Sequence, residues 1–239
     1  MSYQETLTKF EDEKFFVNMV SVDDIIRFGC SIGLNENSHV LDLCCGYGTM
    51  LKIWNNVFKV SGVGVDREAS FIEQGQVRLL NGDVSLICSD VLVYEDNRKY
   101  DVVICTELST GLFNNFEEGI IFLERFLKPD GIIVFGKLFS EIDSPPQELI
   151  DFDGIMPTLN EIYDEVWGYG YLITSMASGT NASWERYITR ESKLLLSRLR
   201  KTPQDTGLLE WTDKWHKIYY NCRRPYENWA LFGIEKLYK

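Results

Sequence analysis

Short apolar runs alternate with helix-period segments between residues 22 and 140 of this 239-residue chain. Two of the runs, "DVVIC" and "GIIVF", are apolar with hardly an interruption. Strands of this kind carry apolar side chains on both faces and are typical of a parallel sheet covered by helices on both sides. The pattern therefore predicts an α/β fold with a doubly wound, mostly parallel sheet.

The predicted elements in this region follow one another with short connections. Helices are expected over residues 22–32, 51–58, 70–80 and 116–127, and strands over 39–43, 62–66, 85–88, 101–105 and 132–135. The stretch "KPDG" separates the last of these helices from the last strand, because Pro and Gly interrupt regular structure.

The pattern changes after residue 140, where "SPPQE" interrupts it. A helix over 159–167 and a strand over 171–176 are predicted next, followed by a long helical stretch over 184–220. A closing strand is expected within "ENWALFGIEKLY". Thirteen of the eighteen Trp and Tyr residues lie beyond residue 160, so the helical stretch reads as an aromatic insertion before the last strand.

Charge and cysteine usage narrow the class of protein. Lys and Arg number 24 against 36 Asp and Glu, a formal net charge of -12 that opposes binding to a phosphate backbone. The six cysteines form no C-x-x-C pair, and the acidic "EDEKFF" near the start does not suit a secretory leader. No apolar stretch approaches the length of a membrane span. We expect a cytoplasmic protein without a membrane partner, and a monomer or homodimer.

The stretch "VLDLCCGYGTM", residues 40–50, ends a predicted strand on a turn of small residues. A G-x-G pair alone indicates only a tight turn, because glycine supplies backbone angles that other residues avoid. The adjacent Cys44 and Cys45 lack a second thiol pair or a neighbouring histidine, so no metal site is expected.

Acidic residues at three strand ends indicate that this turn belongs to a ligand-binding site. Asp66 ends the second strand twenty positions after Gly46, where a carboxylate can accept hydrogen bonds from ribose hydroxyls. Asp90 follows the third strand and can receive an exocyclic amine, while Asp42 just before the turn can meet an ammonium group. Leu51 occupies the third glycine position of the dinucleotide motif, which argues against a pyrophosphate. A nucleoside ligand with a positive charge and no phosphate fits better.

With these motifs in order, the chain resembles the class I S-adenosylmethionine-dependent methyltransferases. The resemblance rests on "VLDLCCGYG", "GVGVD", "ICSDV", "YDVVICTE" and "LKPDGIIVFGK", and it covers roughly residues 22–137 and the closing strand. It implies a Rossmann-like fold of seven strands, mostly parallel, with an antiparallel C-terminal strand. It also implies S-adenosyl-L-methionine as the methyl donor and S-adenosyl-L-homocysteine as the product.

The resemblance divides residues 1–239, read as a single methyltransferase domain, into four segments. These are an N-terminal helical segment (1–33), a cofactor-binding core (34–140), substrate-side helices and an insert (141–224), and a closing strand (225–239).

The same resemblance implies a set of cofactor-binding residues. Asp66 is expected at the ribose, Asp90 with the Val91 backbone at the adenine, and Cys105 and Thr106 beside the methyl group. The full set is Asp42, Cys44, Gly46, Gly48, Asp66, Arg67, Asp90, Val91, Cys105 and Thr106. Cys44 departs from the family's D-x-G-x-G-x-G pattern by replacing its first glycine, and altered affinity is the expected consequence.

Methyl transfer to a hydroxyl or an ammonium group needs a base, and the candidates are Glu107, Glu185 and Tyr187. Glu107 has an equally good interpretation as a helix cap or a solvated strand end. Trp184 and Tyr187 are expected to wall a substrate pocket. Core packing is expected instead for Trp167, Tyr169 and Tyr171, and structural or surface roles for His216 and His39.

Three functions stay open from the sequence. The stretches "DGIMPTLNEI", "WGYGYLI" and "SWERYI" are similar to a branch of the family that methylates small molecules. Together with the acidic composition, this similarity favours an enzyme with a small-molecule acceptor. The alternatives are a methyltransferase acting on RNA or protein, and a non-catalytic protein that binds S-adenosylmethionine.

Overall fold

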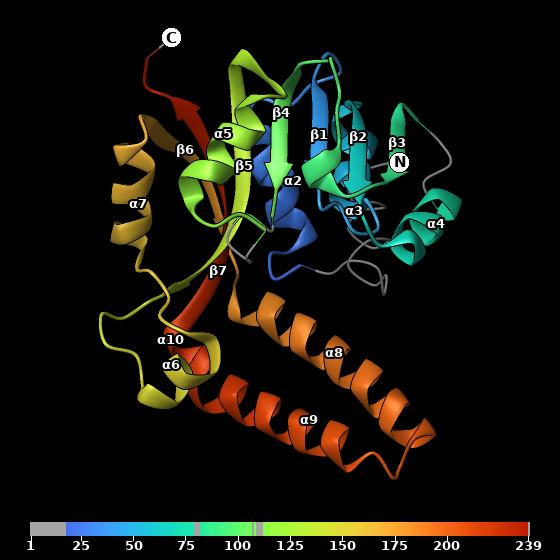
Figure 1. Ribbon diagram of the computed structural model, residues 1–239, viewed down its shortest axis with the longest axis vertical. Helices are drawn as coiled ribbons and strands as arrows, with labels where there is room; N and C mark the ends of the chain where they lie inside the picture. Colours follow the sequence, from blue (N-terminus) through green and yellow to red (C-terminus); the bar gives the residue numbers. More distant parts are fainter. Residues whose placement is uncertain (1–17, 79–81, 107, 109–111, 239) are drawn as a thin grey trace.

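The computed structural model describes residues 18–78, 82–106, 108 and 112–238, and it shows a seven-stranded sheet between layers of helices (Figure 1). The strands are β1 (His39–Leu43), β2 (Ser61–Asp66), β3 (Val84–Cys88), β4 (Tyr100–Cys105), β5 (Leu127–Ser140), β6 (Tyr171–Ser178) and β7 (Glu227–Lys236). Their order across the sheet is β3-β2-β1-β4-β5-β7-β6.

The strand directions confirm the predicted doubly wound sheet. β1 pairs in parallel with β2 and β4, β3 pairs in parallel with β2, and β5 in parallel with β4. β7 is antiparallel to both of its neighbours, β5 and β6. All strands except β7 therefore run the same way, and their carboxyl ends share one edge of the sheet. The predicted antiparallel closing strand is confirmed.

Helices cover both faces because successive strand residues point to opposite sides. Within β1, Leu41 and Leu43 join a buried cluster with α5 (Phe116–Glu124) and α7 (Leu159–Gly168). Val40 joins a second cluster on the other face, with α2 (Val22–Ser31) and α3 (Thr49–Phe58). Asp42 alternates with Leu41 and Leu43, so it points to the α2 and α3 face. The fourth helix of this region, α4 (Ala69–Arg78), follows β2.

The predicted helical stretch over 184–220 is formed by two helices and a π-helical turn. α8 (Asn181–Lys201) ends before Pro203, and α9 (Thr206–Ile218) begins at the cap Asp205, whose side chain accepts a hydrogen bond from the Leu208 N–H. A π-helical turn, Tyr219–Arg223, and the short α10 (Arg224–Tyr226) lead into β7. We call residues 181–218 the arm, which lies below the carboxyl ends of β1 and β4 in Figure 1.

Other elements also differ from the prediction. α5 ends at Glu124 instead of residue 127, and β5 extends well beyond 132–135 because Ile133 to Ser140 pair continuously with β7. A helix not predicted, α6 (Gln147–Asp153), follows the Pro-Pro break. Residues 79 and 80 of the predicted 70–80 helix lie outside the described residues. Among the described helices, none is both long and apolar enough to span a membrane.

Candidate active site

The turn after β1 is built on left-handed backbone. Cys44, Gly46 and Gly48 have φ values of 61°, 54° and 68°. The Cys45 N–H donates to the Val65 carbonyl at 3.1 Å, which ties the turn to β2. Gly48 then caps α3 without a side-chain hydrogen bond. The turn therefore presents backbone at the carboxyl edge of the sheet, and Cys44, which stands where the resembled family has a glycine, adopts the left-handed conformation typical of glycine.

Asp66 lies beside this turn at the end of β2. One carboxylate oxygen accepts a hydrogen bond from the Gly46 N–H at 2.8 Å, and the other accepts one from the Glu68 N–H at 2.9 Å. The side chain is half-buried, so it fixes the turn while it keeps a surface toward solvent.

Asp42 is the buried acid of the site, with 2% of its surface exposed. Burial, and secondarily the charge of Asp66, raises the pKa of Asp42 to about 8. The same group of residues raises the pKa of the neighbouring Cys45 thiol, again mainly through burial. Two carboxylates that share a partly buried site favour a cationic ligand, because a positive charge relieves both the burial penalty and their mutual repulsion.

The candidates after β3 lie next to Asp66 in the sheet. The register pairs Asp66 with Cys88, which places Asp90 two residues beyond the paired position. The exposed Asp90 accepts a hydrogen bond from the Leu92 N–H at 2.9 Å and caps the 3-10 turn Val91–Val93, in which Val91 is buried. Arg67 is exposed. These positions bring the predicted ribose and adenine residues to one edge.

A cavity of about 590 Å³ opens beside Thr106 at the end of β4. We call it the carboxyl-end cavity. Cys105, just before Thr106, is fully buried. The lining is mostly apolar and comes from the ends of β4 and β5, the start of α5, the loop after α6, and β7. Its residues are Met19, Thr106, Leu108, Phe113, Asn114, Asn115, Phe116, Lys137, Leu138, Asp153, Ile155, Met156, Pro157, Glu165 and Trp229.

The predicted catalytic and substrate-binding residues do not gather around the carboxyl-end cavity in the described part of the chain. Glu107 lies outside the described residues. Glu185 is exposed and forms an ion pair with Arg224 at 2.8 Å. Trp184 is 7% exposed and donates its indole N–H to Asn228 at 2.9 Å, and Tyr187 packs edge-on against it with ring centres 6.2 Å apart. These three arm residues are absent from the described lining of the carboxyl-end cavity, and Trp184 packs as part of the buried cluster over α2.

Sequence reasoning did not single out the charged residues of the carboxyl-end cavity. Lys137 and Glu165 form an ion pair at 2.8 Å on its wall, although they are 28 positions apart in the chain. The one available signal was Lys137, which is the last residue of the motif "LKPDGIIVFGK" and directly follows its apolar run.

The two histidines have the structural and surface positions that the sequence predicted. His216 contacts Ser192 and the Thr212 carbonyl, each at 2.7 Å, and His39 is exposed.

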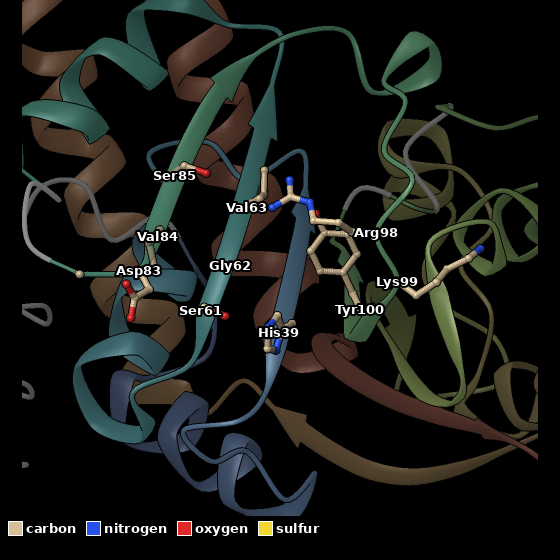
Figure 2. A pocket seen from close by; sticks show the side chains of 11 residues that line it. His39, Ser61, Gly62, Val63, Asp83, Val84, Ser85, Arg98, Lys99 and Tyr100 are labelled. Carbon is tan, nitrogen blue, oxygen red and sulfur yellow. The ribbon is translucent and has the colours of Figure 1, made fainter.

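A second cavity of the same volume lies at the opposite edge of the sheet, where β1 to β4 begin (Figure 2). Ser61, Asp83 and Tyr100 are among its lining residues. It exists because the connection from β3 to β4 contains only the 3-10 turn Val91–Val93, so no α-helix of that described connection covers the face. Ligands of open α/β sheets bind outside the carboxyl ends of the strands. We therefore assign the active site to the edge that holds the glycine turn and Thr106.

Comparisons with known proteins match part of the chain by sequence and nearly all of it by fold. Residues 40–131 match the model of the family described as "Methyltransferase domain". The fold is shared with an S-adenosylmethionine-dependent methyltransferase from Thiobacillus denitrificans, crystallised with S-adenosyl-L-homocysteine. The TM-score is 0.86 over 99% of both chains, at 22% identity.

Two curated relatives match shorter stretches. The malonyl-[acyl-carrier protein] O-methyltransferase of Priestia megaterium is 29% identical over 102 residues, 42% of this chain and 37% of the relative. The cyclopropane-fatty-acyl-phospholipid synthase of Escherichia coli K12 is 27% identical over 140 residues, 54% of this chain and 35% of the relative. The match thus spans little more than a third of the length of these relatives.

The matched domain and the strand order make the chain similar to the S-adenosylmethionine-dependent methyltransferases. S-adenosyl-L-methionine is the cofactor of this class. The matched residues begin in β1 and end in β5, so the arm and the far wall of the carboxyl-end cavity lie outside them. The carboxylates of the site fit this cofactor as acceptors, because buried Asp42 suits an ammonium group and the strand-end Asp66 suits ribose hydroxyls.

Proposed function

We propose that this protein transfers a methyl group from S-adenosylmethionine to a small molecule bound in the carboxyl-end cavity. The observation that carries the proposal is the position of Thr106. Thr106 directly follows Cys105, the last and buried residue of β4, at the edge that holds the glycine turn, and it also lines the cavity. Donor and acceptor sites would therefore meet at this residue.

Each cofactor candidate has a role that its surroundings support. Asp66 would bind the ribose hydroxyls, and Asp42 the ammonium of the methionine part. Asp90 and the Val91 backbone would hold the adenine, with the exposed Arg67 at the rim. The left-handed turn of Cys44, Gly46 and Gly48 lets backbone approach the ligand closely.

The reaction that we propose is a direct in-line displacement. When bound, S-adenosylmethionine supplies a methyl group on a sulfonium centre, which leaves as a neutral thioether. The protein's contribution is to align the acceptor and exclude water, and such positioning accounts for much of the rate in reactions of this kind. An acceptor hydroxyl or ammonium group needs a base, for which Glu107 is the first candidate and Glu185 and Tyr187 the others.

Several observations support a small acceptor. A cavity of about 590 Å³ is in the range that encloses drug-sized molecules. The net charge of -12 opposes RNA as the acceptor. The names of the two curated relatives refer to a carrier-bound malonyl group and to fatty-acyl phospholipids, so an acceptor with acyl character suits the mostly apolar lining.

We also propose a reducing compartment such as the cytoplasm. None of the six cysteines, all of which lie in the described part of the chain, forms a disulfide, and Cys105 and Cys222 are buried. Whether the protein is a monomer or a homodimer stays a prediction.

Methyl-labelled S-adenosylmethionine and a fractionated extract of the source cells test the proposed function. Label in the small-molecule fraction, absent with the Asp66→Ala protein, would support it. Label in RNA or protein would favour the second function considered above. Cofactor binding without any labelled fraction would favour a non-catalytic binding protein.

A further inference from the structure

Lys137 lies on β5, beside the proposed methyl-transfer point at the end of β4. Cys105 of β4 pairs in register with Phe135 of β5. A Cβ atom on Gly136 would lie 3.0 Å from the Thr106 carbonyl oxygen, so β5 runs close beside Thr106. Lys137 is the next residue along β5, and it lines the carboxyl-end cavity.

The ammonium of Lys137 is held on the cavity wall by two contacts. Its Nζ donates to Glu165 Oε2 at 2.8 Å, and it lies 5.4 Å from the centre of the Phe116 ring. A lysine ammonium has three N–H donors, and Glu165 accepts one. Donors therefore remain for a ligand that enters the cavity.

Of the ion pair, Lys137 is the deeper member. Its side chain is 14% exposed, against 34% for Glu165 on α7. The other acid of the lining, Asp153, is engaged by Arg223, whose Nε donates to it at 2.7 Å. A ligand that reaches the inner wall next to Thr106 would therefore meet a positive charge within apolar surroundings, with Glu165 nearer the rim.

We propose that the methyl acceptor is a carboxylic acid with an apolar body, and that Lys137 binds its carboxylate. This inference rests on the proposed function. The carboxylate of the acceptor can bind Lys137 together with Glu165, or it can replace Glu165 as the partner of Lys137. In both cases the charge of the Lys137 ammonium stays compensated. A phosphate group fits less well, because its second negative charge would lie near Glu165 and Asp153 with one described lysine in the lining to balance it.

The class of acceptor can be tested by fractionation before the reaction. Small molecules of a source-cell extract are separated by anion exchange into acidic and non-acidic pools, and each pool is incubated with the protein and labelled S-adenosylmethionine. Part of the acidic pool is first treated with a carbodiimide and ammonia, which converts carboxylates to amides, and another part with phosphatase. We expect label from the acidic pool that survives phosphatase and disappears after amidation.

The other outcomes of this experiment overturn the proposal in distinguishable ways. Label from the non-acidic pool, or label that survives amidation, would overturn the carboxylate and leave the proposed function intact. Label that disappears after phosphatase would assign the anion to phosphate. If no pool becomes labelled although the cofactor binds, the proposed function fails together with this inference.

Variants of the ion pair separate acceptor binding from a structural role. With the active pool as substrate, Lys137→Met should raise KM at least tenfold and change kcat less, while Lys137→Arg should stay within a few-fold of wild type. Glu165→Gln should not raise KM. Equal losses in Lys137→Met and Glu165→Gln would mean that the pair only supports the fold, and would overturn the proposal.

A matched control is available at the other end of the same strand. Lys128→Met removes an ion pair of equal length, 2.8 Å to Asp101, far from the carboxyl edge. It should leave KM unchanged. A KM for Lys137→Met that equals that of Lys128→Met, with both proteins folded by thermal melting, would also contradict a role of Lys137 in acceptor binding.

Discussion

The backbone N–H of Gly46 donates a hydrogen bond to the carboxylate of Asp66 at 2.8 Å, which fastens the glycine turn after β1 to the end of β2. The proposed ribose partner is thus also the side chain that holds the turn in place. Its second oxygen fixes the chain that leads into α4 through the Glu68 N–H. Cofactor binding and the shape of the turn should therefore depend on the same carboxylate.

Asp66→Ala should weaken binding of S-adenosyl-L-homocysteine by about 1–3 kcal/mol, the scale of one lost pair of charge-assisted hydrogen bonds. Asp66→Asn is the matched control, because its amide oxygen can still accept from the Gly46 N–H, and its loss should be smaller. Isothermal titration calorimetry measures both affinities. Affinities equal to that of the wild type would remove Asp66 from the site.

Asp42→Asn should stabilise the cofactor-free protein in a pH-dependent way. The pKa of Asp42 is raised to about 8 by burial and by Asp66, so the folded state holds the proton more tightly than the unfolded state does. Protonated Asp42 therefore contributes its full share to the free energy of unfolding below about pH 4, and this contribution is lost as the pH rises toward 8. The variant should therefore gain about 2–4 kcal/mol over wild type at pH 8 and little at pH 4, measured by urea unfolding.

The same variant should bind S-adenosyl-L-homocysteine more weakly, because it lacks the charge that would pair with the ammonium. A more stable protein with a weaker cofactor site is the signature of a functional buried charge. Loss of both stability and affinity would instead indicate that Asp42 supports the local fold.

Cys44→Gly should raise the free energy of unfolding by about 1 kcal/mol, since Cys44 has a φ of 61° and non-glycine residues pay a steric penalty there. Lys59→Gly offers an independent comparison outside the site, because Lys59 is the C-cap of α3 and has a φ of 64°. Cys45→Gly is the opposite control, because Cys45 is not among the described residues with a positive φ. Glycine there gains nothing from its freedom in the left-handed region, so this variant should lower the free energy of unfolding. Urea unfolding of the three variants checks the order.

Glu107→Gln should lower turnover while it leaves the affinity for S-adenosyl-L-homocysteine nearly unchanged, if Glu107 removes a proton from the acceptor. Glu185→Gln is the comparison, because Glu185 is exposed and already paired with Arg224. Initial rates with a labelled methyl donor measure both. Wild-type turnover in Glu107→Gln would exclude it as the base, and a larger loss in Glu185→Gln would move that role to the arm.

The positions of the proposed cofactor residues were predictable from the sequence because these residues follow buried strands directly. Strand β1 matches the expected 39–43, since apolar runs buried on both faces leave a strong pattern. Asp66 and Asp90 lie at the same edge of the sheet because the carboxyl ends of parallel strands share that edge. What periodicity did not reveal was the αL backbone of Cys44, for which the departure from the family's glycine was the only signal.

The residues of the proposed acceptor site could not be predicted from the sequence in the same way. Lys137 and Glu165 come from β5 and α7, and Trp229 from β7, so their meeting depends on how distant segments pack. Periodicity predicted a helical stretch over 184–220 but not its division into α8 and α9, which Pro203 and the cap Asp205 mark. The aromatic residues of the arm have the composition of a pocket wall, yet Trp184 packs in a buried cluster, and spacing alone did not distinguish the two.

The position of β7 has a consequence for how the protein is made. It follows all other strands in the chain, yet it lies between β5 and β6 and is the only described neighbour of β6 in the sheet. During synthesis the five parallel strands with their cofactor residues emerge first, and β6 stays unpaired until residues 227–236 arrive. The nascent chain can thus complete its donor site before Trp229 closes the acceptor cavity.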